Sequence, residues 1–226
     1  MFDLFGTLTD PAAEGERERI LASTARVLGI EPSVFSTQMR ASFNERCTGA
    51  LGDTASTFVA IGERCGHRLT ADAARLGAAH HLRATAPLRQ AHPHARTVLR
   101  RLRESGYRLA ILSDCSSETV EAWATTPFSA WVDGTLLSWS LGYRKPDPRA
   151  YRAAADQLGV PPEECWFIGD GGSREHWGAA QVGMTPVLIA NTGDDVAHLR
   201  RDADTFVPQH VVPSLADAPD LVLDVR

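Results

Sequence analysis

The spacing of apolar residues divides the chain into two regions. Between residues 11 and 86 apolar residues recur every three or four positions, which is the period of an amphipathic helix. The first such stretch contains Ile20, Leu21, Val27 and Leu28. Glycine and proline interrupt the pattern at intervals, and no strand-like alternation occurs. We therefore expect four or five helices in this segment.

After Pro87, short apolar runs alternate with helical stretches. The runs that predict strands are residues 107–112, 134–138, 165–168 and 186–189, with an edge strand at 205–207. The stretches that predict helices are residues 96–103, 118–124, 148–158, 173–182 and 196–201. Strands separated by helices are typical of parallel βαβ units. The pattern predicts an α/β fold with a doubly wound parallel sheet.

The first residues predict the end of a strand that runs into a tight turn at Gly6. Only two residues precede Asp3, fewer than the ~5–6 of a typical strand, so we expect native residues before Met1. The two patterns together predict two domains. Residues 1–10 and 87–226 would form an α/β core, and residues 11–86 a helical domain inserted after the first strand.

Charge and composition narrow the class of protein. The net charge of -5 argues against a broad surface for nucleic acid or anionic membrane. No apolar run approaches the ~20 residues of a membrane span, and no signal peptide is visible. The four cysteines show neither a C-x-x-C pair nor a zinc spacing. They predict reduced thiols in a cytoplasmic protein.

Lysine is nearly absent from the chain. Lysine and arginine together number 23, and Lys145 is the only lysine. Codon bias toward arginine would leave one lysine by chance. Alternatively, the position needs a compact ammonium that a planar guanidinium cannot replace. Composition alone does not choose between these two interpretations.

Polar residues end the apolar runs of the predicted sheet. They are Asp3, then Ser113 with Asp114, then Asp170, and Lys145 lies in a loop before a helix. Ligands of open parallel sheets bind beyond the carboxyl ends of the strands. One carboxylate can attack a phosphoryl or alkyl centre, a hydroxyl and an ammonium can bind the transferred anion, and a second carboxylate can help to hold a cation.

Four segments of the chain resemble motifs of the haloacid dehalogenase superfamily, a group of aspartate-nucleophile phosphatases and dehalogenases. They are residues 2–10, 109–114, 142–148 and 167–170, the last followed by Glu175, Gly178-Ala179 and Gly183-Met184. Each motif alone is weak, but four in the family's order at fitting separations are specific. The resemblance covers the core from end to end. It implies that the helical insert is the family's cap, which closes over the strand ends and excludes water.

The resemblance also implies catalytic roles. Asp3 would form the covalent intermediate, Ser113 would hydrogen-bond the transferred anion, and Lys145 would neutralise and orient Asp3. Thr7 and Asp114 would lie on the substrate side, although backbone hydrogen bonds are the simpler role for Asp114. The structural alternative for Ser113 is a cap on the turn that follows. The implied substrate is a small anionic molecule, and the implied assembly is a monomer or homodimer.

A magnesium site follows from the same resemblance. Asp3, the backbone carbonyl of Phe5 and Asp170 would hold Mg²⁺, which prefers oxygen ligands. Glu175 is a further candidate, because its carboxylate could reach a metal-bound water. The structural alternatives are a helix cap for Asp170 and an exposed acid in the first turn of a helix for Glu175.

The chain departs from the phosphatase pattern at Phe5. Phosphatases of the family usually have an aspartate two residues after the nucleophile, which protonates the leaving oxygen and later activates water. A phenyl ring cannot transfer a proton, and a general acid or base contributes roughly 10²–10⁴-fold. We therefore expect weak turnover of simple esters. The metal site is unaffected, because only the backbone carbonyl is used at this position.

Three functions fit this combination of residues. Haloacid dehalogenases also have an aromatic residue at the Phe5 position, since halide leaves without a proton, but they work without metal. Because the chain has Gly169-Asp170, the metal-binding form of the motif, we favour a Mg²⁺-dependent phosphatase on a small phosphate monoester. The alternatives are a metal-independent 2-haloacid dehalogenase and a weakly active or non-catalytic member of the family. The last is suggested by Phe5 together with Glu175, where the family often has aspartate.

A few polar residues outside the motifs have simpler interpretations. Arg40, Asn44 and Arg46 in the insert could reach a substrate, but a solvated helix face is the simpler expectation. Asp10 is predicted to belong to the hinge into the insert. We expect His176 to be a packed or surface histidine rather than a ligand or a base.

Overall fold

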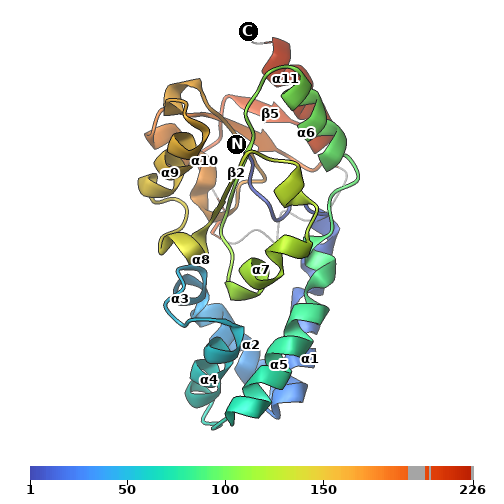
Figure 1. The fold of residues 1–226 in the computed structure, drawn as a ribbon, viewed down its shortest axis with the longest axis vertical. Coiled ribbons are helices and arrows are strands. Elements are labelled where there is room, and N and C mark those ends of the chain that lie inside the picture. The colour runs from blue at the N-terminus through green and yellow to red at the C-terminus, as the bar shows by residue number, and fades with distance from the viewer. Residues whose placement is uncertain (193–201, 204, 225–226) are drawn as a thin grey trace.

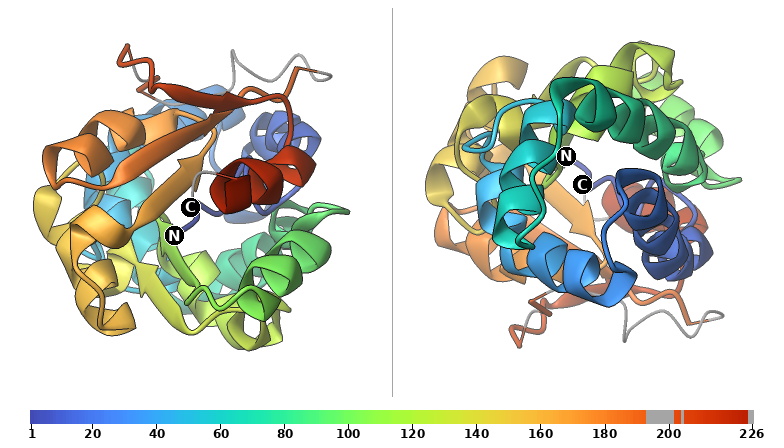
Figure 2. Two further views of the ribbon diagram at one scale, coloured as in Figure 1. Left: turned by 90° about the horizontal axis from the view of Figure 1, so that it is seen from above. Right: turned by 90° about the horizontal axis from the view of Figure 1, so that it is seen from below.

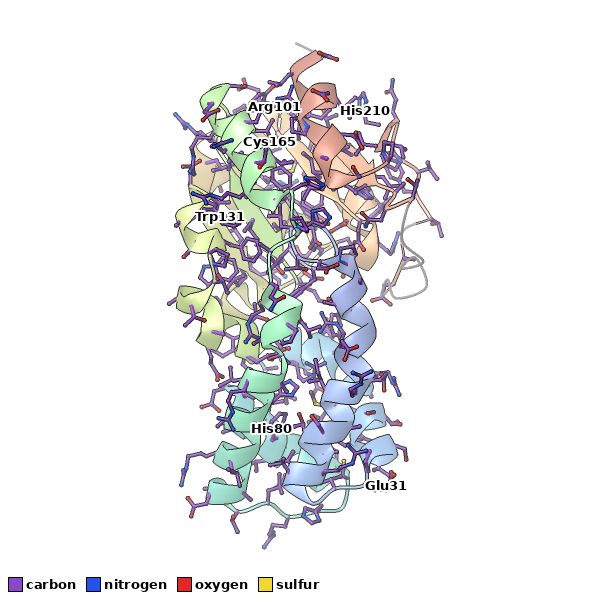
Figure 3. The ribbon with its side chains drawn as sticks, turned by 90° about the vertical axis from the view of Figure 1, so that its right-hand side faces the viewer. Glu31, His80, Arg101, Trp131, Cys165 and His210 are labelled. Carbon is purple, nitrogen blue, oxygen red and sulfur yellow. The ribbon has the colours of Figure 1, made fainter. Side chains whose placement is uncertain are left out.

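The structure, a computed structural model, describes residues 1–192, 202–203 and 205–224. Figure 1 shows an elongated molecule, with a sheet flanked by helices at one end and a bundle of helices at the other. In Figure 3, Glu31 and His80 mark the far end of the bundle, whereas Arg101 and His210 lie at the opposite end of the molecule. Among the described residues, no helix combines the length and the apolar character needed to cross a membrane.

The first residues of the chain form the centre of a parallel sheet. Phe2 pairs with Ile111 on one side and with Ile168 on the other, both in parallel. Its amide donates to Ala110 O at 2.8 Å, and the amide of Asp3 donates to Ile168 O at 2.9 Å. On one side of this segment lie β1 (Ala110–Ser113) and then β2 (Gly134–Leu137). On the other side lie β3 (Trp166–Gly169), β4 (Thr185–Ile189) and β5 (His210–Val212).

Helices cover both faces of the sheet, so the predicted doubly wound fold is confirmed. One face packs on α6 (Ala95–Glu104) and α11 (Ala218–Asp224), through a core that includes Phe2 and Ile111. The other face packs on α9 (Pro148–Leu158) and α10 (Glu175–Gln181), through Ala110 and Phe167. Figure 2 shows the two layers from above. The chain winds outward in both directions from residues 1–3, which places a topological switch point beside Asp3.

One expected strand near the end of the chain is wrong, and one expected helix begins two residues later than predicted. The edge strand expected at 205–207 is wrong, because residues 205–208 have no regular structure and the strand is β5. Val207 is 76% exposed, whereas Val212 is 5% exposed and packs in the core, so burial selects the later run. The helix expected at 196–201 lies outside the described residues. The helix expected from Ser173 begins instead at Glu175, because Ser173 and Arg174 have φ of 54° and 50°.

The insert consists of five α-helices after a short 3-10 helix (Pro11–Glu16). They are α1 (Arg17–Leu28), α2 (Pro32–Ala41), α3 (Phe43–Cys47), α4 (Thr54–Arg64) and α5 (Ala71–Ala84). Local chemistry sets several ends, since Asp53 and Thr70 accept N-cap bonds and Gly29 ends α1 at φ 69°. The helices pack on an apolar core of their own, centred on Phe35 and Phe58.

The chain crosses between the bundle and the sheet end at two adjacent points. Thr9 and Ala91 form an antiparallel bridge, and the amide of His92 donates to Leu8 O at 2.8 Å. Asp10 lies at this crossing, where its side chain accepts from the amide of Ala12 at 3.0 Å and caps the 3-10 helix. The bundle therefore enters and leaves the rest of the molecule at one place.

Candidate active site

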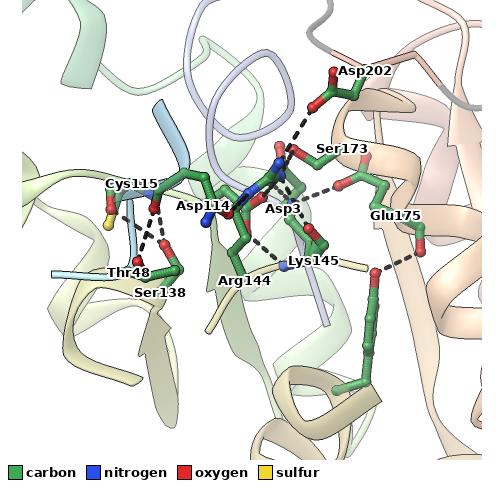
Figure 4. Close-up of polar contacts among 12 residues, drawn as sticks. Asp3, Thr48, Asp114, Cys115, Ser138, Arg144, Lys145, Ser173, Glu175 and Asp202 are labelled. Carbon is green, nitrogen blue, oxygen red and sulfur yellow. Dashed lines mark hydrogen bonds and ion pairs between the residues drawn. The ribbon is translucent and has the colours of Figure 1, made fainter. Parts of the chain in front are cut away.

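Most of the predicted site residues meet at the carboxyl edge of the sheet. Asp3 follows the central segment, Ser113 ends β1, and Asp170 follows β3. Lys145 reaches the same point from the loop between α8 (Ser138–Leu141) and α9, and Glu175 from the start of α10. Figure 4 shows Lys145 between Asp3 and Glu175. Residues far apart in the sequence thus converge at the switch point.

One ammonium joins two buried carboxylates. Lys145 Nζ donates to Asp3 Oδ1 at 2.5 Å and to Glu175 Oε2 at 2.6 Å. Asp3 is 6% exposed, Lys145 2% and Glu175 0%. Such a burial of charge is costly unless the charges pair, and here two carboxylates share one cation. The lone lysine of the chain therefore lies against Asp3, as the sequence predicted.

The pKa values of the three groups shift as this arrangement requires. Burial lowers the pKa of the Lys145 ammonium, but the Asp3 and Glu175 carboxylates outweigh it and raise this pKa well above its usual value. Burial raises the pKa of the Glu175 carboxyl well above its usual value, against the opposing charge of Lys145. Burial likewise raises the pKa of Asp3, which Lys145 opposes. Lys145 is therefore the permanent cation of the site.

Glu175 is held on every side. Its Oε1 accepts from the amide of Gly171 at 2.8 Å, and its backbone carbonyl accepts from Tyr151 Oη at 2.9 Å. A Cβ at Gly169 would lie 2.2 Å from Glu175 Oε1, so only glycine permits this approach. Sequence reasoning treated Glu175 as a marginal metal candidate and did not predict its ion pair with Lys145.

The carboxylates form a cluster that suits a hard cation. Oxygen atoms of Asp3, Asp170 and Glu175 lie within 4.8 Å of one another. Gly6 makes room for this cluster, since it has φ of 76° and a Cβ there would lie 2.9 Å from Asp170 Oδ2. Oxygen donors on a mostly buried site are the ligands that Mg²⁺ accepts, with water completing its shell. The residues present therefore fit a Mg²⁺ ion.

Two buried hydroxyls, one in the turn after Asp3 and one at the end of β1, have no hydrogen-bond partner in the described part of the chain. Among the described residues, Thr7 Oγ1 and Ser113 Oγ are buried side-chain oxygens of this kind, in residues that are 1% and 0% exposed. Buried polar atoms nearly always have a partner, so an orphan calls for an explanation. Thr7 and Ser113 were both predicted as substrate-binding residues.

Asp114 fastens the lysine loop instead of facing a ligand alone. Its Oδ1 accepts from the amide of Lys145 at 3.0 Å, and its Oδ2 accepts from Arg144 Nη1 at 3.1 Å. Arg144 also donates to Asn44 Oδ1 at 3.1 Å and lies over the ring of Phe43 at 5.1 Å. Sequence reasoning missed Arg144, although its place next to the only lysine was an available signal.

A cavity of about 470 Å³ lies between the helical bundle and the carboxylate cluster. The bundle contributes Arg17, Arg40 and Arg46 to its lining. The expectation of a solvated face is wrong for Arg46, whose Nη1 donates to Ser116 Oγ at 2.9 Å. The expectation fails because Arg46 lies on α3, on the side of the bundle that faces the sheet. His176, in contrast, is packed as expected, at 1% exposure with Nε2 3.0 Å from Val187 O.

Phe5 shares this cavity with an arginine that the sequence did not single out. The Cζ atom of Arg17 lies 5.1 Å from the centroid of the Phe5 ring. Glu14 holds the guanidinium by two bonds, from Nε to Oε2 at 2.5 Å and from Nη2 to Oε1 at 2.9 Å. The spacing of three residues between Glu14 and Arg17 predicts an ion pair, but it does not predict that the guanidinium lies over the Phe5 ring.

The curated proteins that are similar to this chain include both phosphatases and dehalogenases. The (S)-2-haloacid dehalogenase 4A of Burkholderia cepacia is 33% identical over 132 residues, 56% of this chain and 53% of the relative. The glyceraldehyde 3-phosphate phosphatase of Methanopyrus kandleri is 30% identical over 135 residues, 59% of this chain and 55% of the relative. The matches thus span about half the length of these curated relatives.

One solved structure shares its fold with the whole length of this chain. The L-2-haloacid dehalogenase of Xanthobacter autotrophicus with chloropropionic acid covalently bound aligns with a TM-score of 0.66 at 23% identity, over 100% of this chain and 98% of that one. A family model of hydrolases, haloacid dehalogenase-like hydrolase, matches residues 1–183, a range that contains all four motif segments and Glu175. The chain therefore belongs to the haloacid dehalogenase-like hydrolases.

Proposed function

We propose that this hydrolase is a Mg²⁺-dependent phosphatase that uses Asp3 to attack a small phosphate monoester. The observation that carries the proposal is the cluster of Asp3, Asp170 and Glu175, whose carboxylate oxygens lie within 4.8 Å of one another. Three carboxyl groups outnumber the one ammonium of Lys145, so an anionic substrate needs a further cation there. Asp3, Asp170 and the backbone carbonyl of Phe5 would hold Mg²⁺, with Glu175 as a further candidate, and the ion would supply that positive charge.

The remaining side chains act on the phosphoryl group and its surroundings. Lys145 keeps the Asp3 carboxylate oriented through the 2.5 Å bond to Oδ1 and leaves the other oxygen for attack on phosphorus. The hydroxyls of Thr7 and Ser113, which lack a partner among the described residues, donate to phosphoryl oxygens. These hydrogen bonds strengthen as negative charge builds up on the oxygens in the transition state. Residues 11–86 serve as a cap that excludes water from the cavity. We also place the protein in the cytoplasm, because its four cysteines are free thiols.

The first test is hydrolysis of p-nitrophenyl phosphate with Mg²⁺ and with EDTA. We expect turnover that needs Mg²⁺ and that falls by at least about 10³-fold in Asp3→Asn, since this variant keeps the shape but loses the nucleophile. A matched variant, Asp10→Asn, changes a carboxylate at the crossing outside the cluster and should keep most of the activity. Turnover that survives in Asp3→Asn, or that ignores EDTA, would contradict the proposal.

Dehalogenation is the second candidate, favoured by the phenyl ring of Phe5 in the cavity wall. The matched relative from Burkholderia cepacia is a dehalogenase by name, which adds support. Halide release from short 2-haloacids in EDTA decides between the two. Release that is lost in Asp3→Asn, with no phosphate turnover, would replace the phosphatase by a dehalogenase.

A further inference from the structure

The position that carries the proton donor in the family's phosphatases is covered by a guanidinium. Phe5 lies two residues after Asp3, and the Cζ atom of Arg17 lies 5.1 Å from the centroid of its ring. Arg17, Phe5 and Asp3 line the same cavity. The Glu14 fork fixes the guanidinium there with bonds of 2.5 and 2.9 Å. A permanent cation thus takes the place of an acid.

Besides Asp3, Asp114, Asp170 and Glu175, four acids among the described residues line the cavity, and each is held by a neighbouring side chain. They are Glu14 and Glu18 on the helical bundle, and Glu118 and Asp202 outside it. Glu14, Glu18 and Asp202 are paired with Arg17, Arg40 and Arg144, respectively. Glu118 accepts from Ser116 Oγ at 2.8 Å. Burial raises the pKa of Glu118, but His81, Arg46 and this bond bring it below its usual value.

His81 lines the same cavity, and its neutral ring is unsuited to give a proton. It is 4% exposed, and its Nδ1 lies 2.9 Å from Thr24 Oγ1. Burial lowers the pKa of His81 to about 4, so the ring is neutral near pH 7. A neutral imidazole is a very weak acid. Neither His81 nor Glu118 is therefore suited to protonate a leaving group beside Phe5, where the Arg17 guanidinium lies.

We infer that the leaving group departs as an anion beside Arg17, so that the substrates are acyl phosphates and other phosphates with a weakly basic leaving group. The inference rests on the proposed phosphatase function and names its substrate class. A guanidinium stays charged at any physiological pH and presents several N–H donors, so it can bind a carboxylate as it leaves. Alkyl phosphates would have to leave as strongly basic alkoxides, which needs an acid.

The chemistry balances without a proton donor. One Asp3 carboxylate oxygen forms a bond to phosphorus while the bond from phosphorus to the bridging oxygen breaks. The bridging oxygen keeps the electron pair and departs in a carboxylate anion, for which Arg17, with its Cζ atom 5.1 Å from the centroid of the Phe5 ring, is the proposed cationic partner. Water then attacks phosphorus, the bond to Asp3 breaks with its electron pair returning to the carboxylate, and both protons of water stay on inorganic phosphate.

The test is a series of leaving groups measured in the same enzyme preparation with Mg²⁺. The substrates are acetyl phosphate, p-nitrophenyl phosphate, phenyl phosphate and glycerol phosphate. We expect kcat/KM to fall along this series by roughly 10²–10⁴-fold, the usual contribution of the missing acid. The quantity to compare is the ratio of kcat/KM for glycerol phosphate to that for acetyl phosphate, because the ratio does not depend on the folded fraction.

Variants at two positions separate the causes. Phe5→Asp introduces the acid and should raise the ratio at least tenfold, whereas Phe5→Asn, of similar size but without a proton, should not. Arg17→Met should lower kcat/KM for acetyl phosphate at least tenfold, and Arg17→Lys should retain part of it because it keeps the charge.

Three outcomes would overturn the inference. Wild-type enzyme that hydrolyses glycerol phosphate as fast as acetyl phosphate would do so, and would leave the phosphatase proposal standing. Equal ratios in Phe5→Asp and Phe5→Asn would do so as well. No turnover of any phosphate would remove the proposed function and this inference together.

Discussion

Lys145 shows why a single lysine can persist in a chain that otherwise uses arginine. Its ammonium contacts carboxylate oxygens of Asp3 and Glu175 at 2.5 and 2.6 Å in a space that is almost fully buried. A planar guanidinium is wider and would need both carboxylates to move apart. The importance of Lys145 was predictable from composition and from the neighbouring motif. Its second partner was not, because an acid in the first turn of a helix also fits a surface role.

At the same scale, His81 should make stability depend on pH. Burial lowers the pKa of His81 to about 4, Glu118 opposes the shift, and Arg46, Arg89 and His80 add to it. An unfolded histidine has a pKa near 6.5, so between pH 6.5 and 4 the unfolded state binds more protons and stability falls as pH falls. We expect His81 to account for a loss of roughly 2 kcal/mol between pH 7 and pH 5.

Urea unfolding at the two pH values checks this expectation. His81→Gln removes the titration and should flatten the pH dependence by about that amount. His67→Gln is the matched control, because His67 is an exposed histidine of the same bundle. An identical pH dependence in wild type and His81→Gln would contradict the expectation.

At the scale of elements, the contact between α9 and α10 positions Glu175. A Cβ at Gly178 would lie 2.5 Å from Tyr151 Oη, and Tyr151 is 0% exposed and bonded to Glu175 O, so it cannot move aside. Gly178→Ala should therefore displace α10, with a loss of about 1–3 kcal/mol in the free energy of unfolding and lower kcat. Gly15→Ala is the control, since no atom lies within 4 Å of its added Cβ. Urea unfolding and phosphatase assays in which the two variants behave alike would contradict this.

Element boundaries were predictable where local chemistry marks them. The helix predicted at 148–158 is α9 as found, because Asp147 caps it, Pro148 begins it and Gly159 ends it in a left-handed conformation. The start of α10 was misplaced by two residues, because Ser173 and Arg174 have positive φ that their residue types do not signal. The last strand was misplaced because two short apolar runs compete for one edge, and only packing chooses between them.

At the scale of the molecule, α4 ties the bundle to the sheet end through one residue. Thr54 is 2% exposed, its amide and hydroxyl both donate to Glu121 Oε1 at 2.8 Å, and its hydroxyl lies 2.8 Å from Ser117 Oγ on α7 (Ser117–Ala122). Thr54→Val keeps the shape but removes the hydroxyl partner of Ser117 Oγ, whose residue is 2% exposed, which costs about 1–3 kcal/mol. We expect KM to rise several-fold and amide exchange in α4 to increase.

Thr37→Val is the control, because the Thr37 hydroxyl bonds to Ser33 O on an exposed face. This variant should change neither KM nor amide exchange. Equal KM values in both variants would contradict the role of Thr54.

The division into a helical segment and an α/β segment was readable from the period of apolar residues, and so was the convergence of Asp3, Ser113, Lys145 and Asp170. The opposite wall of the cavity was not. Arg17 and Arg46 reach it only because the bundle folds back over the strand ends, and helical periodicity does not say which polar face turns inward. The sequence therefore predicts the surroundings of Asp3 better than those of Arg17.

The bridge between Thr9 and Ala91 holds the two ends of the helical segment side by side, so the segment can be exchanged as one unit. Paired residues of antiparallel strands lie about 4.5–5.5 Å apart, a gap that a tight turn can close. One such segment can therefore be exchanged for another, by recombination or by design, without rerouting the sheet. Arg17 lies on the exchangeable segment, whereas Asp3 and Lys145 lie outside it. Under the proposed mechanism, an exchange would therefore change which group leaves and keep the attack by Asp3.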